Sequence, residues 1–113
     1  MLFAGETVLV AGRQFTVNER DLRHVAAMRE HLVDVAWAGE KSTYAELVEA
    51  AQLPYPARGL GRLLALLSED CGRRGEPSLA CLVVTKESNE VGSGYGTGAL
   101  EERQRLYAYW RLS

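Results

Sequence analysis

The chain has 113 residues, of which 47% are hydrophobic and 25% charged, and its formal net charge is −2. This size and composition are typical of one soluble globular domain, and no apolar run is long enough to cross a bilayer. The small negative charge argues against strong non-specific binding to nucleic acid, which requires Lys and Arg at many phosphates. We expect a cytoplasmic protein, because no basic region precedes an apolar one at the N-terminus.

Two short apolar-rich runs near the N-terminus predict a β-hairpin. They span Thr7 to Val10 and Gln14 to Val17, and Gly12 between them supplies the turn. Because two strands alone are barely stable, we interpret residues 1–18 as a small appendage to the main domain.

The first long helix is predicted from residue 19 to about residue 38. Asn18 offers an N-cap, Asp21 places negative charge in the first turn, and Gly39 ends the helix. Trp37, near the end, is expected to be a core anchor because tryptophan buries a large area. The apolar residues on one face are Leu22, Val25, Leu32, Val35 and Ala36.

The central stretch, residues 43–67, predicts two short helices separated by a proline-marked turn. Thr43 and Glu46 have the spacing of a capping box at the start of the first helix. Pro54 and Pro56 end that helix and begin the second, because proline suits the first turn of a helix but not its interior. The second helix then buries one stripe of leucines, which are Leu60, Leu63, Leu64 and Leu67.

The opposite side of this second helix carries Arg58, Gly59 and Arg62, and its two arginines project from one face. Gly59 and Gly61 are poor helix formers, and one reason to carry them is the close approach of another backbone. A helix-turn-helix that presents arginine and glycine outward is suited to reading a DNA groove. The alternative is a helical hairpin whose arginines are merely solvated.

The remainder of the chain predicts a loop, a strand pair and a closing helix. Residues 69–77 are expected to form a loop with at most a last helical turn, and the apolar run from Leu79 to Thr85 a buried strand. After a turn at residues 86–90, Val91 begins a returning strand. Alternating glycines follow, without the lysine and spacing of a phosphate-binding loop, and we interpret them as a wing tip: Gly92, Gly94, Gly96 and Gly98. A helix from Ala99 to Trp110 ends the pattern.

The predicted order after the hairpin is helix, helix, turn, helix, strand, wing, helix, which is the winged-helix arrangement. We therefore predict a mostly α protein with a small β part. Its main domain, residues 19–113, is expected to be a winged helix-turn-helix, preceded by the N-terminal β-hairpin.

Cysteine and histidine spacing predicts no metal site and no other cofactor. Cys71 and Cys81 do not make a disulfide framework, and neither has a second cysteine or a histidine at metal-ligand spacing. His24 and His31 lie seven residues apart on a predicted helix, but two ligands do not make a zinc site. We interpret both histidines as partly exposed helix residues.

Four segments, in this order, carry a resemblance to a known family: Thr43-Tyr44-Ala45-Glu46-Leu47-Val48, Ala57-Arg58-Gly59-Leu60-Gly61, Leu79-Ala80-Cys81-Leu82-Val83-Val84 and Gly94-Tyr95-Gly96. They resemble the DNA-binding domain of the alkylguanine-DNA alkyltransferases and the alkyltransferase-like proteins. Those domains carry Thr-Tyr-Gly-Glu-Leu-Ala, then Ala-Arg-Ala-Val-Gly on the recognition helix, Pro-Cys-His-Arg-Val-Val, a Gly-Tyr-x-Gly loop and a closing helix. The resemblance covers about two-thirds of the chain.

The sequence departs from this family at the reactive centre. When the paired valines are aligned, Ala80 stands where the family has its alkyl-accepting cysteine, and Cys81 where it has histidine. A reactive thiol needs a base or an electropositive setting, and Cys81 has no neighbouring histidine, so we interpret it as a small core residue. The alkyltransferase-like proteins also lack the cysteine and bind alkylated DNA without repairing it. The resemblance therefore implies a role in DNA repair without catalysis.

The resemblance also implies roles for single residues. Tyr44 is similar to the residue that helps turn the phosphate of the target nucleotide, although its ring could instead pack on the core with the hydroxyl at the surface. Arg58 is similar to the arginine that enters the base stack where the target base leaves. Gly59 and Gly61 would let the helix sit deep in the groove, and Tyr95 is similar to a pocket-loop residue. The predicted DNA-binding residues are Thr43, Tyr44, Arg58, Gly59, Arg62, Ser93 and Tyr95.

Two functions follow from these patterns. The first is a non-catalytic DNA-binding protein of alkyltransferase-like type, which binds duplex DNA and senses modified bases. The second is a protein-interaction or regulatory module that kept the winged-helix scaffold without DNA binding. The arginines of the second hairpin helix favour the first, whereas the acidic balance and the missing reactive motif favour the second. An enzyme that uses the glycine loop would lack both a nucleophile–base pair and a metal cluster.

Overall fold

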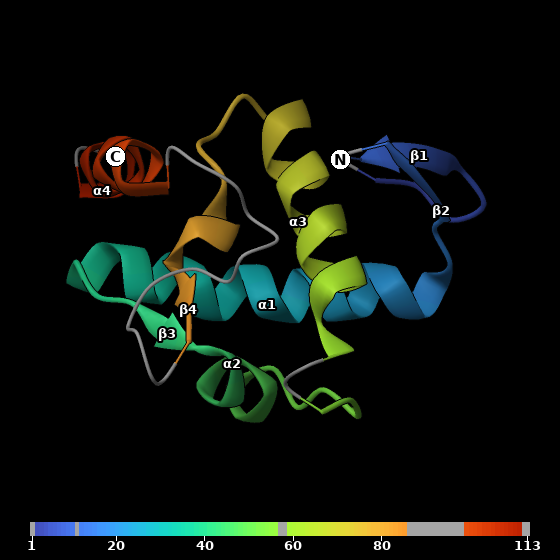
Figure 1. The fold of residues 1–113 in the computed structure, drawn as a ribbon, viewed down its shortest axis with the longest axis horizontal. Coiled ribbons are helices and arrows are strands. Elements are labelled where there is room, and N and C mark those ends of the chain that lie inside the picture. Colours follow the sequence, from blue (N-terminus) through green and yellow to red (C-terminus); the bar gives the residue numbers. More distant parts are fainter. Residues whose placement is uncertain (1, 11, 57–58, 86–98, 112–113) are drawn as a thin grey trace.

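The fold is arranged around one long helix, α1 (Glu19–Ala38), in a computed structural model that describes residues 2–10, 12–56, 59–85 and 99–111. The helices α2 (Tyr44–Ala50), α3 (Gly61–Arg73) and α4 (Ala99–Arg111) all contact α1. Figure 1 shows α3 crossing α1, with α2 on one side of α1 and α4 on the other. The prediction of a mostly α protein with a small β part is confirmed.

The predicted N-terminal hairpin is present, with its second strand shifted by one residue. β1 (Thr7–Val10) pairs antiparallel with β2 (Arg13–Thr16), and Gly12 between them has a φ of 78°, a conformation that glycine adopts without steric cost. Val8 lies opposite Phe15 and is buried in the same apolar cluster as the helices. The hairpin therefore packs on the core and does not stand away from it.

Both ends of α1 form as the sequence predicts. The Asn18 side chain accepts a hydrogen bond from the Asp21 N–H at 2.8 Å, and the Asp21 carboxylate accepts one from the Asn18 N–H at 3.0 Å. Gly39 ends the helix in the left-handed conformation at a φ of 70°. The expected anchor role of Trp37 is wrong, because its side chain is 53% exposed. It lies one position beyond the buried stripe that ends at Ala36, so it faces solvent.

The second hairpin helix begins later than predicted. Residue Gly59 closes a turn by donating its N–H to the Pro56 carbonyl at 2.9 Å, and α3 starts only at Gly61. Its far end continues through Arg73 as a full helical turn, where ion pairs of i,i+4 spacing support it. Of the predicted leucine stripe, Leu64 is only half-buried. The fully buried leucines of this region are Leu60, Leu63, Leu66 and Leu67.

The predicted strand from Leu79 to Thr85 is mostly wrong. Residues Leu79–Leu82 form a 3₁₀ turn, η2, and only β4 (Val83–Val84) is a strand. Ser78 starts the turn, since its side chain accepts from the Ala80 N–H at 3.3 Å. All six residues from 79 to 84 are buried, so the apolar run carried no alternation that could distinguish a strand from a turn.

The small second sheet is parallel. β4 pairs with β3 (Ser42–Thr43), with Ser42 opposite Val83. The predicted returning strand and wing fall within residues 86–98, which lie outside the described residues, so the winged-helix arrangement stays a prediction. In the part of the chain that the structure describes, no helix is long and apolar enough to cross a membrane.

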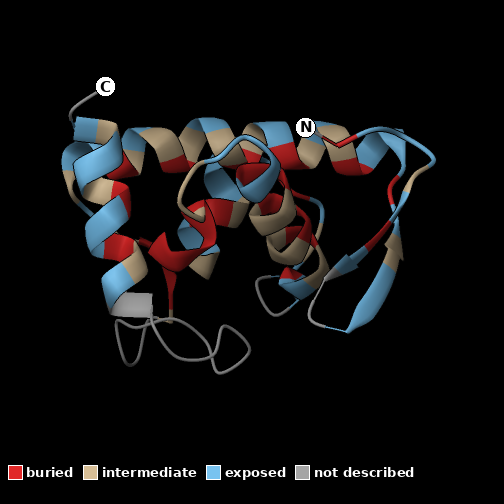
Figure 2. Ribbon diagram, turned by 90° about the horizontal axis from the view of Figure 1, so that it is seen from above, coloured by how far each residue is buried: buried red, intermediate tan, exposed pale blue. Residues whose placement is uncertain are grey.

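The core fills the space between α1 and the elements packed on it, as the buried residues in Figure 2 show. The closing helix α4 matches its predicted range to within one residue and buries Leu106. Tyr107 ties it to the end of α1, donating its hydroxyl to the Glu40 carbonyl at 2.6 Å. Trp110, half-buried, packs against the core, whereas Trp37 does not.

Replacing leucines of α3 tests this assignment of its buried face. We expect Leu63→Ala to lower the free energy of unfolding by about 2–5 kcal/mol, because it leaves a cavity in a core position. Leu64→Ala is the matched control, and its loss should be clearly smaller because Leu64 is half-buried. Urea denaturation of both variants measures the difference. Equal losses, or a larger loss for Leu64→Ala, would show that the buried face is misassigned.

Candidate nucleic-acid interface

The described part of the predicted DNA-binding set lies where α2 and α3 begin. Thr43 is the N-cap of α2, and its capping box with Glu46 forms as predicted, with hydrogen bonds of 2.8 and 3.1 Å. Tyr44 is the first residue of α2 and is half-buried against the core. Arg58, Ser93 and Tyr95 lie outside the described residues. The capping bond engages the Thr43 hydroxyl as an acceptor but leaves its proton able to bond a phosphate oxygen.

Arg62 is held by a partner that the sequence analysis did not identify. Its two terminal nitrogens donate to the two carboxylate oxygens of Asp21, at 2.7 Å for Nη2 and Oδ2, and Nη2 also donates to the Thr16 carbonyl at 2.8 Å. Asp21 is only 3% exposed, whereas Arg62 is half-buried at the surface. The ion pair joins the first turn of α3 to the first turn of α1 and to β2.

The ion pair shifts the proton affinity of both groups. The hydrogen bond from Arg62, opposed by burial, holds the pKa of Asp21 below its ordinary value, and the same bond raises the pKa of Arg62. The carboxylate is therefore ionised at neutral pH and compensates the guanidinium charge. Arg62 thus joins α3 to α1. Its contact with a DNA phosphate stays a prediction.

The two glycines at the start of α3 have no packing neighbour that requires them. A methyl group on Gly61 would meet no atom within 4 Å, and one on Gly59 would make ordinary contacts of 3.7 Å with Pro56. Both positions are exposed. Leu60 at the N-cap position makes no side-chain capping bond to α3. Among the described residues, this end of the helix presents the positive end of its dipole and two glycines.

Other arginines lie on the two elements that Arg62 joins to α3, which are β2 and the start of α1. Arg20 and Arg23 lie in the first two turns of α1 and are exposed. Among the described residues, neither has an ion-pair partner. Arg13 of β2 and Arg62 both lie over the ring of Phe15, at 5.6 and 6.0 Å from its centroid. We call Arg13, Arg20, Arg23 and Arg62 the arginine corner.

The positions of the basic residues in α1 are a sequence signal for the arginine corner. Arg20 stands in the first turn of the helix, where the helix dipole disfavours a cation, while the last turn contains no basic residue. His24, which lies edge-on to Tyr55 with the ring centroids 5.3 Å apart, adds no charge at neutral pH. Burial and then the nearby Arg20 lower the pKa of His24. The positive charge of the corner therefore comes from guanidinium groups alone.

The cysteines are buried and contribute no reactive group to this surface. Cys81 has no measurable exposure, and burial raises the pKa of its thiol to about 12. Its interpretation as a small core residue is confirmed. Both histidines are half-buried helix residues, as predicted, and His31 hydrogen-bonds Ser42 at 3.2 Å. No group of three metal-ligating side chains occurs among the described residues.

Comparison with known proteins assigns no family. No protein-family description matches the chain, and neither the curated proteins nor the solved structures contain a match. The resemblance to the alkyltransferase-like proteins therefore rests on the four sequence segments described above.

The Asp21–Arg62 pair predicts a pH-dependent stability. Asp21→Asn keeps an oxygen that can accept from the Asn18 N–H but removes the charge, and should cost about 1–3 kcal/mol at neutral pH. Because the pKa of Asp21 is lowered in the folded state, this stabilisation is complete above the ordinary value of 3.8 and is lost as the pH falls through the lowered value. The difference in the free energy of unfolding between wild type and Asp21→Asn should therefore disappear as the pH falls below 3.8.

Denaturant unfolding of both proteins at several pH values provides the measurement. Glu49→Gln, an exposed carboxylate on α2, is the matched control and should change the free energy of unfolding by less than about 0.5 kcal/mol. If wild type and Asp21→Asn differ in the free energy of unfolding by the same amount down to acid pH, the ion pair does not form.

Proposed function

We propose that the chain is a non-catalytic DNA-binding protein of the alkyltransferase-like winged-helix type, and that the arginine corner contacts duplex DNA. The observation that carries the proposal is the placement of Arg20 and Arg23. Both are exposed and lack an ion-pair partner among the described residues, and Arg20 stands at the helix end where its charge opposes the dipole by about 0.3–1 kcal/mol. A cation in a position that costs stability is explained by an anionic partner.

The start of α3 supports the same partner. It has no side-chain cap at Leu60, and the positive end of its helix dipole favours phosphate. Gly61 leaves open space beside the backbone, so a groove wall or a sugar–phosphate strand can approach closely. The ion pair of Arg62 with Asp21 fixes this end of α3 beside the first turn of α1. The start of α3 therefore lies beside the helical turn that carries Arg20.

The sensing of modified bases belongs to the same proposal and rests on the resemblance. Arg58 occupies the position of the family's inserting arginine, next to Gly59. An inserted side chain stabilises the gap left when a base leaves the stack, and a damaged or mismatched base leaves at the lowest cost. The buried thiol of Cys81, with its raised pKa, accords with binding without alkyl transfer.

Arg20→Gln separates a binding role from a structural one. We expect weaker DNA binding and a salt slope reduced by about one unit, because one phosphate contact is lost. The thermal stability should stay the same or rise, because the cation leaves the positive end of the helix dipole. Fluorescence anisotropy with an undamaged duplex at two salt concentrations measures the first effect, and thermal unfolding the second. Arg105→Gln, on the exposed face of α4, is the control and should keep wild-type affinity.

Two outcomes would contradict this assignment. If wild type binds no duplex even at low salt, the DNA proposal fails and the interaction-module alternative takes its place. If Arg105→Gln weakens binding as much as Arg20→Gln, the contact is non-specific and the corner is not the interface.

Arg58→Ala tests the sensing of modified bases. Wild type should bind a duplex with an alkylated guanine more tightly than the undamaged duplex, and Arg58→Ala should remove that preference as well as weaken overall binding. Arg20→Gln is the matched comparison, because a phosphate contact should weaken binding to both duplexes equally. Equal affinity of wild type for both duplexes would refute lesion sensing and leave DNA binding intact.

A further inference from the structure

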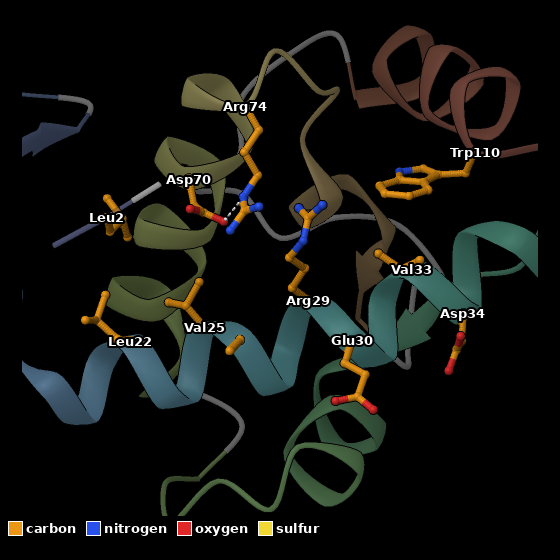
Figure 3. Close-up of a pocket in the computed structure, with 11 residues that line it drawn as sticks. Leu2, Leu22, Val25, Arg29, Glu30, Val33, Asp34, Asp70, Arg74 and Trp110 are labelled. Carbon is orange, nitrogen blue, oxygen red and sulfur yellow. Dashed lines mark hydrogen bonds and ion pairs between the residues drawn. The ribbon is translucent and has the colours of Figure 1, made fainter. Parts of the chain in front are cut away.

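A groove of about 520 Å³ lies on the side of α1 opposite α2, between α1, α3 and α4 (Figure 3). This volume is within the range of sites that bind small molecules or peptide side chains. The apolar part of its lining comes from three places in the chain and consists of Leu2, Leu22, Val25, Ala26, Val33 and Trp110. Along α1 the groove extends from Leu22 to Asp34, about 18 Å at the helical rise per residue. It is long enough for about three turns of a helix laid along it.

The basic side chains in the groove are already compensated. Arg29 donates from both terminal nitrogens to the two carboxylate oxygens of Glu76, at 2.6 and 2.8 Å, and lies over the Trp110 ring at 5.6 Å. Arg74 donates from Nε to the buried carboxylate of Asp70 at 3.0 Å. Each guanidinium thus has its own carboxylate, so the groove offers little net attraction to an anion.

The acidic side chains at the rim are not compensated. Glu30 and Asp34 lie on the exposed face of α1, one turn apart, and have no ion-pair partner among the residues that the structure describes. Figure 3 shows both carboxylates projecting from α1 away from Arg29 and Arg74. The uncompensated charge beside the apolar groove is therefore negative, which favours a cationic occupant and repels nucleic acid and anionic lipid.

We propose that this groove binds a basic amphipathic segment of a partner protein. Apolar side chains of the segment pack on Val25, Val33 and Trp110, while its Lys or Arg side chains lie beside Glu30 and Asp34. This is the helix-in-groove mode of recognition, in which apolar anchors at spacings of three and four residues provide affinity and the charged rim provides specificity. The proposed binding site does not depend on DNA binding.

Trp110 provides a direct readout, because the chain has two tryptophans and the other, Trp37, is exposed outside the groove lining. Trp37→Phe leaves Trp110 as the only indole.

A random 16-residue peptide library displayed on phage is selected against the full chain, and the enriched peptides are synthesised. They should combine apolar residues at i, i+3 and i+4 with Lys or Arg. Each should shift the Trp110 emission of Trp37→Phe to shorter wavelength as the peptide covers the ring.

The rim charges are tested by reversing them. Affinity for the enriched peptides should fall about tenfold in Glu30→Lys/Asp34→Lys, because like charges then face each other. Glu49→Lys, which reverses an exposed carboxylate on α2, is the matched control and should keep wild-type affinity. Circular dichroism checks that the exposed substitutions leave the fold intact.

Three results would overturn the proposal. The first is a selection that enriches no peptide, or enriches peptides without basic residues. The second is equal affinity of wild type and Glu30→Lys/Asp34→Lys. The third is a Trp110 emission shift caused by duplex DNA but not by the peptides, which would assign the groove to nucleic acid.

Discussion

The ion pair between Asp21 and Arg62 is the constraint on which the arrangement of this protein depends. The Asp21 carboxylate is buried, and an unpaired buried charge is costly, so its donors must stay in place. Those donors are the Asn18 N–H at the start of α1 and the two terminal nitrogens of Arg62 at the start of α3. One carboxylate therefore caps the first helix and attaches the third helix to it. The bond from Arg62 to the Thr16 carbonyl adds the hairpin to the same junction.

An ion pair of this kind fixes the arrangement of the helices more than it adds to the net stability of the fold. Desolvation offsets much of the attraction between buried charges, but the loss of one partner leaves the other buried and unpaired. The pair consequently penalises any packing in which α3 leaves the first turn of α1. The start of α3 is thereby held beside the first turn of α1 and beside β2.

The charged residues of the molecule differ in their pairing although their sum is only −2. Among the described residues, Arg20 and Arg23 of the arginine corner and Glu30 and Asp34 at the groove rim have no ion-pair partner. The arginines in the groove and Arg62 of the corner are paired with carboxylates. The total charge of the chain therefore does not describe its surface, because pairing determines which charges remain available. Local signals in the sequence were reliable: the N-cap at Asn18, the capping box of Thr43 and Glu46 and the glycine that ends α1 formed as predicted, since each depends on residues within one turn. Long-range choices were not: Arg62 pairs with a residue 41 positions away, Trp37 is exposed although it was expected to anchor the core, and the uniformly apolar residues 79–82 form a turn. Periodicity reports which face of an element is buried, but not what that face meets.

The most direct test of the account is an NMR titration of the labelled protein with a short duplex at low salt. Duplex binding at the arginine corner should shift the backbone amide signals of Arg20, Gly59, Gly61 and Arg62 most strongly. The signals of Val33 and Trp110, across α1 in the groove, should change little. Shifts concentrated in the groove, or no shifts at any duplex concentration, would contradict the assignment of the corner as the DNA-binding surface.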